Sequence, residues 1–514
     1  MTATETEAGA GAREWIALAV LGVPAVLVMM NMSVLYLALP SLSAELEPDG
    51  PQLLWITDVY GFMVAGSLVA MGTLGDRLGH RRLLLTGAVA FTCASVAAAY
   101  VPSAEALIAA RAAQGVAAAA LAPSSLALIR ALFHDARRRA LAITIWMLAF
   151  MGGGALGPLV GGVLLQYSWW GAVFLLAVPA MALLLVTGPF LIPEPRERTA
   201  GRLDAASVAL SLLTPLTIVY GVKDLAVHGL TPPGVAALLA GAVLAAVFVR
   251  RQRRLPHPLL DLRLFALPAF SVSVAGMVVV GVVLFGTSLL TSQYLQLVLG
   301  LSPLAAGLWQ LPTAIAGTVV ALVVSGLTGR IRPVVLMSAG AAFALIGPVL
   351  LTQVDTDPVV LVAGSVFLFA GLTPFMALGT GLIVAAAPPE RAGAASAISE
   401  TGAELGGALG IAVLGGIATG VYGGHLARNA PEGLPVAVAE AARETLPAAL
   451  RAARPLPEAL GRPLVQAARD AFAHSLHVHA LITIPLLVAL AVLTLTVRRT
   501  TTPPADARRK DHRP

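Results

Sequence analysis

The chain has 514 residues, of which 58% are hydrophobic and only 12% are charged, with a mean hydropathy of +0.85. Soluble domains carry about 25% charged residues, so this composition excludes a soluble enzyme or binding module and indicates an integral membrane protein. The formal net charge of +6 favours contact with anionic lipid over nucleic-acid binding, and the single cysteine, Cys93, excludes an intramolecular disulfide.

Hydropathy divides the chain into about fourteen apolar segments, each close to the 20 residues or so that a helix needs to cross a bilayer. The segments cover 15–39, 53–72, 83–101, 104–129, 140–166, 171–192, 205–222, 232–249, 268–299, 303–327, 334–351, 358–386, 394–422 and 479–497. Arginines gather in alternate loops, which the positive-inside rule places in the cytoplasm together with both termini. The sequence therefore predicts an all-α, multi-pass protein of the cell (inner or cytoplasmic) membrane.

The first two segments each carry a polar residue inside an apolar run. Asn31 lies in the second half of the first segment, and Asp58 lies roughly one turn into the second. Trp55 precedes Asp58 by three residues and shares its helical face. An indole beside a carboxylate favours an organic cation, and the alternative is an aromatic belt with Asp58 near the outer head groups.

The turn between the second and third segments, 72–82, is rich in glycine and charge. Its glycines permit a sharp reversal, while the carboxylate can cap a helix start and pair with neighbouring arginines. We interpret it as a charge latch that differs between conformations, with a solvated turn that only fixes topology as the alternative. The residues involved are Gly72, Gly75, Asp76, Arg77, Gly79 and Arg81.

The fourth segment embeds Arg111 in an alanine-rich helix, where it needs an acidic or carbonyl partner; Asp58 and Glu105 are the candidates. The fifth segment is rich in small residues that allow close backbone contact, and its proline introduces a kink. These residues are Gly153, Gly157, Pro158, Gly161 and Gly162. Ordinary helix packing is the alternative to a conformational role.

The thirteenth segment contains two carboxylates, Glu400 and Glu404, which share one helical face. A charged side chain near the bilayer centre costs about 3 kcal/mol on insertion scales and usually marks an ion or substrate path. Desolvation and mutual repulsion raise the proton affinity of such a pair, so we interpret it as a proton site. A hydrogen-bonded pair that only holds helices together is the alternative.

The stretch 423–473 alternates alanine-rich runs with arginine, glutamate and proline, which predicts short amphipathic helices in a long outer loop. His474, His477 and His479 follow it. We favour a wet interfacial cluster over a metal site there, because no cysteine completes a ligand set. The sequence contains no phosphate-binding loop and no hydrolase or metalloprotease motif, so we predict neither an enzyme nor direct ATP hydrolysis.

Together these motifs resemble the major facilitator superfamily, specifically its fourteen-helix drug:proton antiporters, which include quaternary-ammonium efflux pumps. The turn 72–82 matches the family's loop motif, 107–115 its helix-four arginine motif and 153–162 its helix-five antiporter motif. The resemblance implies two six-helix bundles plus two inserted helices, and 325–332 reads as a decayed copy of the turn 72–82. We expect an N-terminal bundle with a cytoplasmic tail in 1–200, linker helices in 201–255, and a C-terminal bundle with the long outer loop and a cytoplasmic tail in 256–514.

The resemblance also implies proton-coupled export of lipophilic or cationic drugs and antiseptics, driven by the proton motive force without cofactor or metal. The chain would act as a monomer in lipid and bind no nucleic acid. Proton coupling is expected from Glu400, Glu404, Asp58 and Arg111. Substrate binding is expected from Asn31, Trp55, Asp58, Gln293, Tyr294, Trp309 and Gln310. Two alternatives stay open: a dedicated exporter of one natural product that confers self-resistance, and a membrane receptor or scaffold without transport.

Two departures from the family pattern narrow the expected substrate. Asn31 stands where the first helix usually has an acid, and no charged residue lies between positions 264 and 329. We therefore expect monovalent or neutral apolar drugs in preference to divalent cations.

Overall fold

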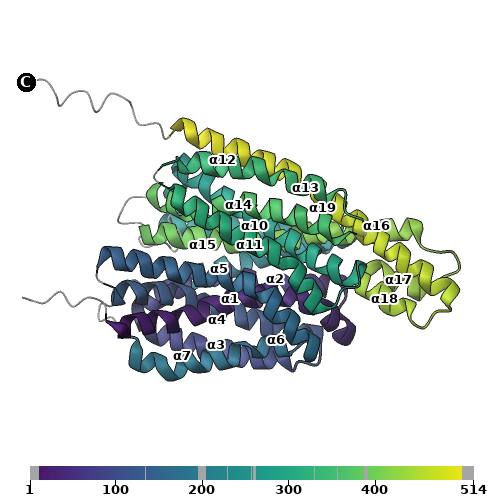
Figure 1. Ribbon diagram of the computed structural model, residues 1–514, viewed down its shortest axis with the longest axis horizontal. Helices are drawn as coiled ribbons and strands as arrows, with labels where there is room; N and C mark the ends of the chain where they lie inside the picture. The colour runs from purple at the N-terminus through teal and green to yellow at the C-terminus, as the bar shows by residue number, and fades with distance from the viewer. Residues whose placement is uncertain are drawn as a thin grey trace, which may run out of the picture.

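The computed structural model describes residues 11–133, 135–194, 204–228, 230–255, 258, 262–328, 330–355, 357–386 and 392–500. Long helices run side by side along the longest axis of the molecule (Figure 1). Helix α1 begins and helix α19 ends at one end, called here the terminal end. Helices α17 (Val436–Glu444) and α18 (Leu446–Ala453), together called here the insertion, project from the opposite end, called here the insertion end.

The first group of helices shares one core. Its members are α1 (Ala12–Leu46), α2 (Gly50–Leu78), α3 (His80–Ala99), α4 (Ala104–Leu132), α5 (Ala136–Tyr167), α6 (Ala172–Leu175) and α7 (Ala177–Leu191). Helix α1 packs along α5, and α4 packs between α2 and α3. The core is filled by side chains such as Leu21, Tyr60 and Phe91, none of which is exposed.

The second group follows the same layout. Its members are α10 (Pro268–Gln293), α11 (Pro303–Leu327), α12 (Pro333–Ala344), α13 (Ile346–Leu351), α14 (Pro358–Ala386), α15 (Ala392–Leu409), α16 (Gly416–Asn429), α17 (Val436–Glu444), α18 (Leu446–Ala453) and α19 (Glu458–Thr500). A 3-10 turn, η1 (Leu264–Ala266), precedes α10, and π-helical turns extend α10 as η2 (Tyr294–Val298) and join α15 to α16 as η4 (Gly410–Gly415). Helix α14 packs against α10, α11 and α12.

Two further helices, α8 (Ala205–His228) and α9 (Pro232–Arg254), pack against each other between the groups in sequence. Asp204, just before α8, accepts hydrogen bonds from Arg251 Nε at 2.5 Å and Nη2 at 2.7 Å. These bonds, with one from Ser207, hold the pKa of Asp204 well below its usual range. The pair therefore stays ionised at neutral pH and ties the two helices at the terminal end.

Local sequence explains where many helices begin. Asp49 and Gln52 form a reciprocal capping box at the start of α2, and Ser103, Asp135, Thr231 and Ser302 cap α4, α5, α9 and α11. Each side chain accepts a backbone N–H that the first helical turn would leave unpaired.

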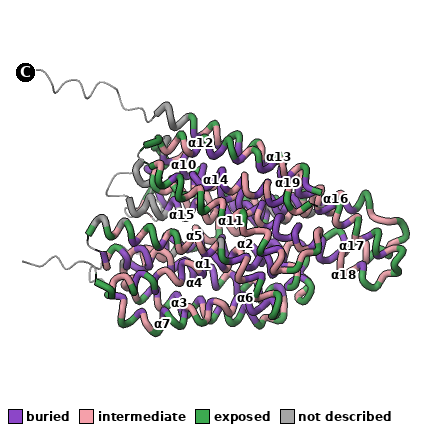
Figure 2. The backbone as a smooth tube through the Cα atoms, viewed as in Figure 1, coloured by how far each residue is buried: buried purple, intermediate pink, exposed green. Residues whose placement is uncertain are grey.

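The outer surface of the bundle is apolar. Exposed residues lie along the outside of the bundle (Figure 2). Many of them are large and apolar, for example Val186, Phe190, Leu239 and Val243. Lipid tails cannot form hydrogen bonds. A helix that crosses a bilayer must therefore satisfy its own backbone polar groups and present apolar side chains to the outside. The chain is therefore a multi-pass membrane protein.

Each of the predicted apolar segments coincides with a helix or a broken helix. Within the described residues, eleven helices are long and apolar enough to cross a membrane, or twelve if the bent α5 counts as one span. Helices α2 and α8 fall outside that set, and α8 offers only a shorter apolar stretch, Ala206–Gly221.

The predicted outer loop 423–473 is largely helical and much shorter than expected. Helix α16 continues to Asn429 and α19 begins at Glu458, so both extend beyond the apolar segments. The amphipathic helices expected between them are α17 and α18. Arg451 of α18 forms an ion pair with Glu47 (Nε to Oε1, 3.6 Å) and donates to the carbonyl of Ser43, which fastens the insertion to α1.

Candidate functional site

A cavity of about 230 Å³ lies between the two helix groups. Helices α1 and α5 line one side, and α10, α11 and α14 line the other. Its walls are apolar, thioether and hydroxyl groups, among them Met29, Tyr36, Phe285, Ser288 and Phe369. None of the described residues that line it is charged, which agrees with the absence of charge between positions 264 and 329. Such a wall accommodates lipophilic molecules.

Arg111 is fully buried beside this cavity, in the middle of the first group. Its guanidinium lies over the Tyr60 ring, with 4.5 Å between Cζ and the ring centroid. Nη1 donates to Asn31 Oδ1 at 2.7 Å and to Gln114 Oε1 at 3.2 Å, and Nε donates to the Ile56 carbonyl at 3.3 Å. A ring face and three neutral oxygens thus hold the cation in place.

The sequence analysis expected an acidic or carbonyl partner for Arg111, and the Ile56 carbonyl is a carbonyl partner of this kind. The side-chain acceptors that Arg111 contacts are the neutral oxygens of Asn31 and Gln114, whereas the candidate Glu105 accepts from Gln52 Nε2 at 2.5 Å on the surface. Asn31, which stands in place of the family's usual acid, is therefore a hydrogen-bond partner of Arg111 rather than part of the cavity wall.

The carboxylate of Asp58 is fully buried in α2. The residue lies eight positions into the helix, or about 12 Å from its start at Gly50. Helix α2 packs against α15, where a Cβ built at Gly61 would lie 3.3 Å from Ala408 Cβ. Glu404 belongs to α15 and is half-buried. Helices α2 and α15 therefore each carry an acid where the two helix groups are in contact. Glu400 is also in α15, but its side chain lies outside the described part of the structure.

Tyr36 connects these acids to the cavity, and the sequence analysis missed it. The side chain lines the cavity, and its hydroxyl is buried with no hydrogen-bond partner among the described residues. It lies within electrostatic range of Arg111, Asp58 and Glu404. A tyrosine in an apolar run gives no sequence signal, because only the tertiary fold turns it toward both neighbours.

The predicted substrate residues separate into different environments. Gln310 lines the cavity, as expected. Tyr294 does not, because it is buried against Phe472 and donates to the Asp355 carbonyl. Trp309 packs on the core near the insertion end, and Trp55 packs with Phe62 and Ala408 between α2 and α15. Neither tryptophan lines the cavity. Gln293 lines a separate cleft described below.

The helix-five residues form two tight seams. On one side, a Cβ at Gly153 would lie 2.1 Å from the Val26 carbonyl oxygen of α1, and one at Gly157 would lie 1.9 Å from Ser33 Oγ. Gly161 packs in the same way against Val34. On the other side, a Cβ at Gly307 of α11 would lie 2.2 Å from the Pro158 carbonyl oxygen. Helix α5 therefore packs closely against α1 on one side and α11 on the other, and so joins the two groups beside the cavity.

Gly162 extends the second seam. A Cβ there would lie 2.8 Å from the Pro303 carbonyl oxygen at the start of α11. The contact joins helices of the two groups, so any rearrangement between the groups must open or slide this seam.

The glycine-rich turn joins α2 to α3, and Gly79 adopts a positive φ of 98° there. Arg81 pairs with Glu194 (Nε to Oε2, 3.4 Å) and donates to the Ile192 carbonyl at 3.1 Å, which ties the start of α3 to the end of α7. Glu194 was not predicted. The N-cap residue of α3 is Gly79, which has no side chain to accept a capping hydrogen bond. Asp76, the predicted helix cap, has a side chain that lies outside the described part of the structure.

The other turn positions differ in how crowded they are. A Cβ at Gly75 would lie 2.4 Å from His80 Nδ1, whereas the space beside Gly72 is open within 4 Å. Arg77 is half-buried in the last turn of α2. Gly75 therefore allows His80 to fold back over the end of α2, and Gly72 has no comparable steric role.

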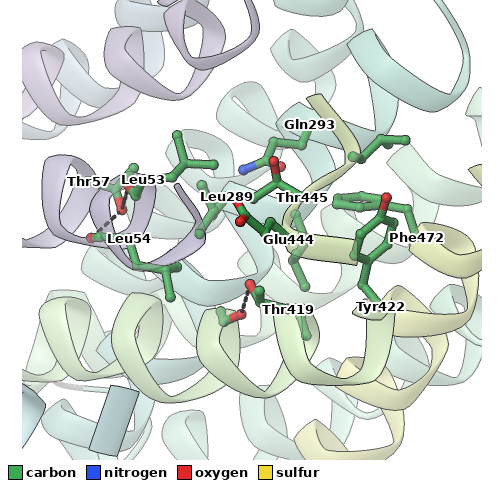
Figure 3. Close-up of a pocket in the computed structure, with 15 residues that line it drawn as sticks. Leu53, Leu54, Thr57, Leu289, Gln293, Thr419, Tyr422, Glu444, Thr445 and Phe472 are labelled. Atoms are coloured by element: carbon green, nitrogen blue, oxygen red, sulfur yellow. Dashed lines mark hydrogen bonds between the residues drawn. The ribbon is translucent and has the colours of Figure 1, made fainter. Parts of the chain in front are cut away.

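A second, smaller cleft of about 40 Å³ lies at the insertion end (Figure 3). Helices α2, α10 and α16 form its walls, and Glu444 and Thr445 close it from the insertion. Glu444 as a whole is exposed, but the cleft partly desolvates its carboxyl group; this desolvation, and then the nearby Asp49, raise the pKa of Glu444, while Arg451 opposes the shift. The insertion thus places an acid against the start of α2, within the cleft between the groups.

This pKa shift predicts that the insertion docks more tightly at low pH. A raised pKa means that docking favours protonated Glu444, so the stabilisation is present below the ordinary glutamate pKa and is lost as pH rises through the raised value. Hydrogen exchange of the α17 amides, corrected for intrinsic rate, should therefore show protection that is largest at acidic pH and falls as the pH rises above the ordinary range of a glutamate pKa. Glu444→Gln should flatten the profile, and Glu440→Gln, on the same helix but not among the residues that line the cleft, should not. A pH-independent wild-type profile would contradict the prediction.

The histidines predicted as a wet cluster are in three separate environments. His474 stacks on His425 with ring centroids 4.5 Å apart, and His477 bonds to the Val354 carbonyl at 2.8 Å. His479 is buried and bonds to Thr287 at 2.9 Å, so the wet cluster was wrong for this residue. In the described ranges no three histidine, cysteine or acidic side chains lie close enough to hold a metal ion.

Two helix groups that enclose a cavity inside a membrane bundle, with a buried arginine and a buried aspartate in the surrounding helices, define a solute transporter rather than an enzyme. The model of the Major Facilitator Superfamily matches residues 23–411, and the chain belongs to this family.

Sequence relatives cover almost the whole chain. It is 44% identical over 483 residues to the multidrug efflux pump LfrA of Mycolicibacterium smegmatis, covering 94% of this chain and 95% of that protein. It is 34% identical over 464 residues to the methyl viologen resistance protein SmvA of Salmonella typhimurium, covering 90% and 93%.

A solved structure supports the fold. A bacterial homologue of the human lysosomal transporter Spinster superposes with a TM-score of 0.64 at 16% identity, covering 95% of this chain and 99% of that one.

Proposed function

We propose that this chain is a proton-coupled antiporter that exports lipophilic or cationic drugs and antiseptics. The observation that carries the proposal is Tyr36, whose side chain borders the cavity while lying in the field of Asp58, Glu404 and Arg111. A charge change at the acids alters the cavity wall through this residue, and a bound cation alters the proton affinity of the acids in return. Such reciprocal coupling is what an antiporter requires. The names of LfrA and SmvA support drug efflux as the class of transport.

The uncharged cavity favours apolar substrates with at most one positive charge. Aromatic faces from Tyr36, Phe285 and Phe369 line it, and these attract a cation without a formal counter-charge. Divalent cations would require a carboxylate in the wall, so we rank them lower. In this proposal Asp58 and Glu404 bind and release the proton. Neither Asp58 nor Trp55 lines the cavity, so we do not assign them to substrate contact.

We place the terminal end in the cytoplasm and the insertion end outside the cell. Arginines gather in the turn 72–82, after α9 and after α19 in the sequence. Helix α19 ends at the terminal end (Figure 1), and the positive-inside rule assigns such arginine-rich segments to the cytoplasm. Both chain ends would be cytoplasmic, in the inner or cytoplasmic membrane. The transporter would work as a monomer, driven by the proton motive force without a cofactor.

The energy source can be tested directly. In cells of a pump-deficient host, ethidium efflux should stop when a protonophore dissipates the proton gradient and should continue when ATP is depleted but the gradient is kept. The motive is the set of intramembrane acids in a chain whose sequence has no nucleotide motif. Efflux that resists the protonophore, or that follows ATP alone, would refute the proposal.

Tyr36→Phe tests the coupling residue. The ring stays, so binding of a lipophilic cation should change little, whereas loss of the hydroxyl should slow gradient-driven efflux by about tenfold, within the range of allosteric coupling energies. Dye binding and initial efflux rates measure the two effects separately. Tyr220→Phe, at an exposed position of α8, is the matched control and should leave both unchanged. Equal losses of binding and efflux in Tyr36→Phe would point to a packing role instead.

A further inference from the structure

A second large cavity, called here the side pocket, lies away from the central one and has a volume of about 310 Å³. It is formed by α2, the inserted helices α8 and α9, and α15. No residue lines both this pocket and the central cavity. Because α2 and α15 belong to different helix groups, the side pocket is a place where the inserted helices meet both groups.

One tight contact and an internal proline of α8 lie beside the pocket. Ser211 Oγ donates to the Gly66 carbonyl at 2.9 Å, and a Cβ at Gly66 would lie 2.7 Å from Leu212, so α8 is held close to α2 there. Pro215 follows within the same helix, and an internal proline bends a helix and removes one backbone N–H. Pro215 itself lines the pocket.

The pocket is closed toward the insertion end. Phe62 of α2, Val219 of α8 and Ala408 of α15 form a fully buried cluster there. Phe248 of α9 contributes to the wall. Leu213 of α8 and Leu239 of α9 are exposed aliphatic side chains. The two inserted helices that contribute to the pocket wall therefore also present apolar side chains to the bilayer.

Its lining combines an apolar wall with two hydroxyl groups. Thr214 of α8 and Thr401 of α15 line the pocket, and both hydroxyl oxygens are buried without a hydrogen-bond partner among the described residues. Thr401 is three residues before Glu404 on the same helix, so the two share a face. A hydrocarbon chain would leave both hydroxyls unsatisfied, whereas an amphiphile with an amine or hydroxyl group would pair with them.

We infer that the side pocket binds a lipophilic amine taken directly from the bilayer, at a site distinct from the central cavity. Its volume is at the lower end of the range for sites of drug-sized ligands. The apolar wall takes the hydrocarbon part, the two threonine hydroxyls take the polar end, and Glu404 lies within a turn to attract the ammonium. The inference deepens the proposed function, on which it rests for the class of ligand, by assigning a binding role to the two inserted helices.

Photolabelling of the full chain in phosphatidylcholine nanodiscs, without a proton gradient, tests this. The probe is a diazirine derivative of dodecyldimethylamine, and labelled peptides are mapped by mass spectrometry. We expect labelling of the peptides that contain Thr214 and Thr401. Thr214→Phe, which fills the pocket, should remove it, and Thr214→Val, which keeps the shape but lacks the hydroxyl, should weaken it by about fivefold, the order of one hydrogen bond. Leu213→Phe, on the exposed face of α8, is the matched control and should label like the wild type.

Several outcomes would overturn the inference. Labelling that persists in Thr214→Phe, or that avoids both peptides in the wild type, would exclude the pocket. Equal labelling by a diazirine fatty acid that the amine fails to displace would assign the site to a lipid chain.

Because labelling needs no gradient, its result is independent of the efflux assay. If the chain is labelled as expected but shows no gradient-driven efflux, the proposed function is rejected and the binding pocket is retained. If the chain exports the dye but is not labelled, only the inference about the side pocket is rejected.

Discussion

Asp58→Asn is expected to uncouple drug export from the proton gradient. Asparagine keeps the size and one hydrogen-bonding oxygen of the buried side chain, but it cannot gain or lose a proton. Protonation at this site can therefore no longer shift the equilibrium between the inward-open and outward-open states that an antiporter must alternate between. The drug concentration ratio that a given pH gradient sustains should fall by up to about 100-fold, the upper range of coupling between two sites. Dye accumulation in everted vesicles at a series of imposed pH gradients measures the ratio directly.

Glu404→Gln should behave in the same direction, because Glu404 is carried by α15 at the contact with α2. Glu105→Gln is the matched control, since Glu105 is an exposed acid at the start of α4. Dye binding without a gradient should persist in all three variants. If Asp58→Asn still followed the pH gradient as the wild type does, Asp58 would have to be removed from the coupling mechanism.

Gly153→Ala is expected to destabilise the chain and to stop export, whereas Gly152→Ala should be tolerated. The new methyl group at position 153 would lie 2.1 Å from the Val26 carbonyl oxygen, and backbone atoms of α1 cannot move aside as a side chain can. Space within 4 Å of the corresponding position at Gly152 is open. Overpacking of this kind costs about 1–3 kcal/mol, while alanine in a helix is favoured over glycine by about 1 kcal/mol.

Thermal unfolding in detergent and dye efflux in cells measure the two consequences. We expect a lower melting temperature for Gly153→Ala and an unchanged or slightly higher one for Gly152→Ala. Two neighbouring glycines of one helix thus form a matched pair in which only the contact differs. Equal behaviour of the two variants would show that close packing of α1 on α5 is not required.

The sequence by itself determined the membrane environment, the positions of the helices and the family. These follow from local properties: apolar runs of bilayer length, N-capping residues such as Asp49 and Ser103, and glycine-rich motifs at fixed spacing. It also located the acids of the thirteenth segment, because a carboxylate is conspicuous in an apolar helix.

Only the tertiary structure decided which side chains surround the cavity and which partners the buried charges have. Helix α1 is apolar on nearly every face, so its sequence does not reveal that Tyr36 looks inward or that Asn31 turns to Arg111. The side pocket likewise depends on α2, α8, α9 and α15, which are distant in sequence. Periodicity reports burial along one helix, whereas a site between helices depends on their relative rotation and separation, and close contacts such as Gly153 on Val26 set both.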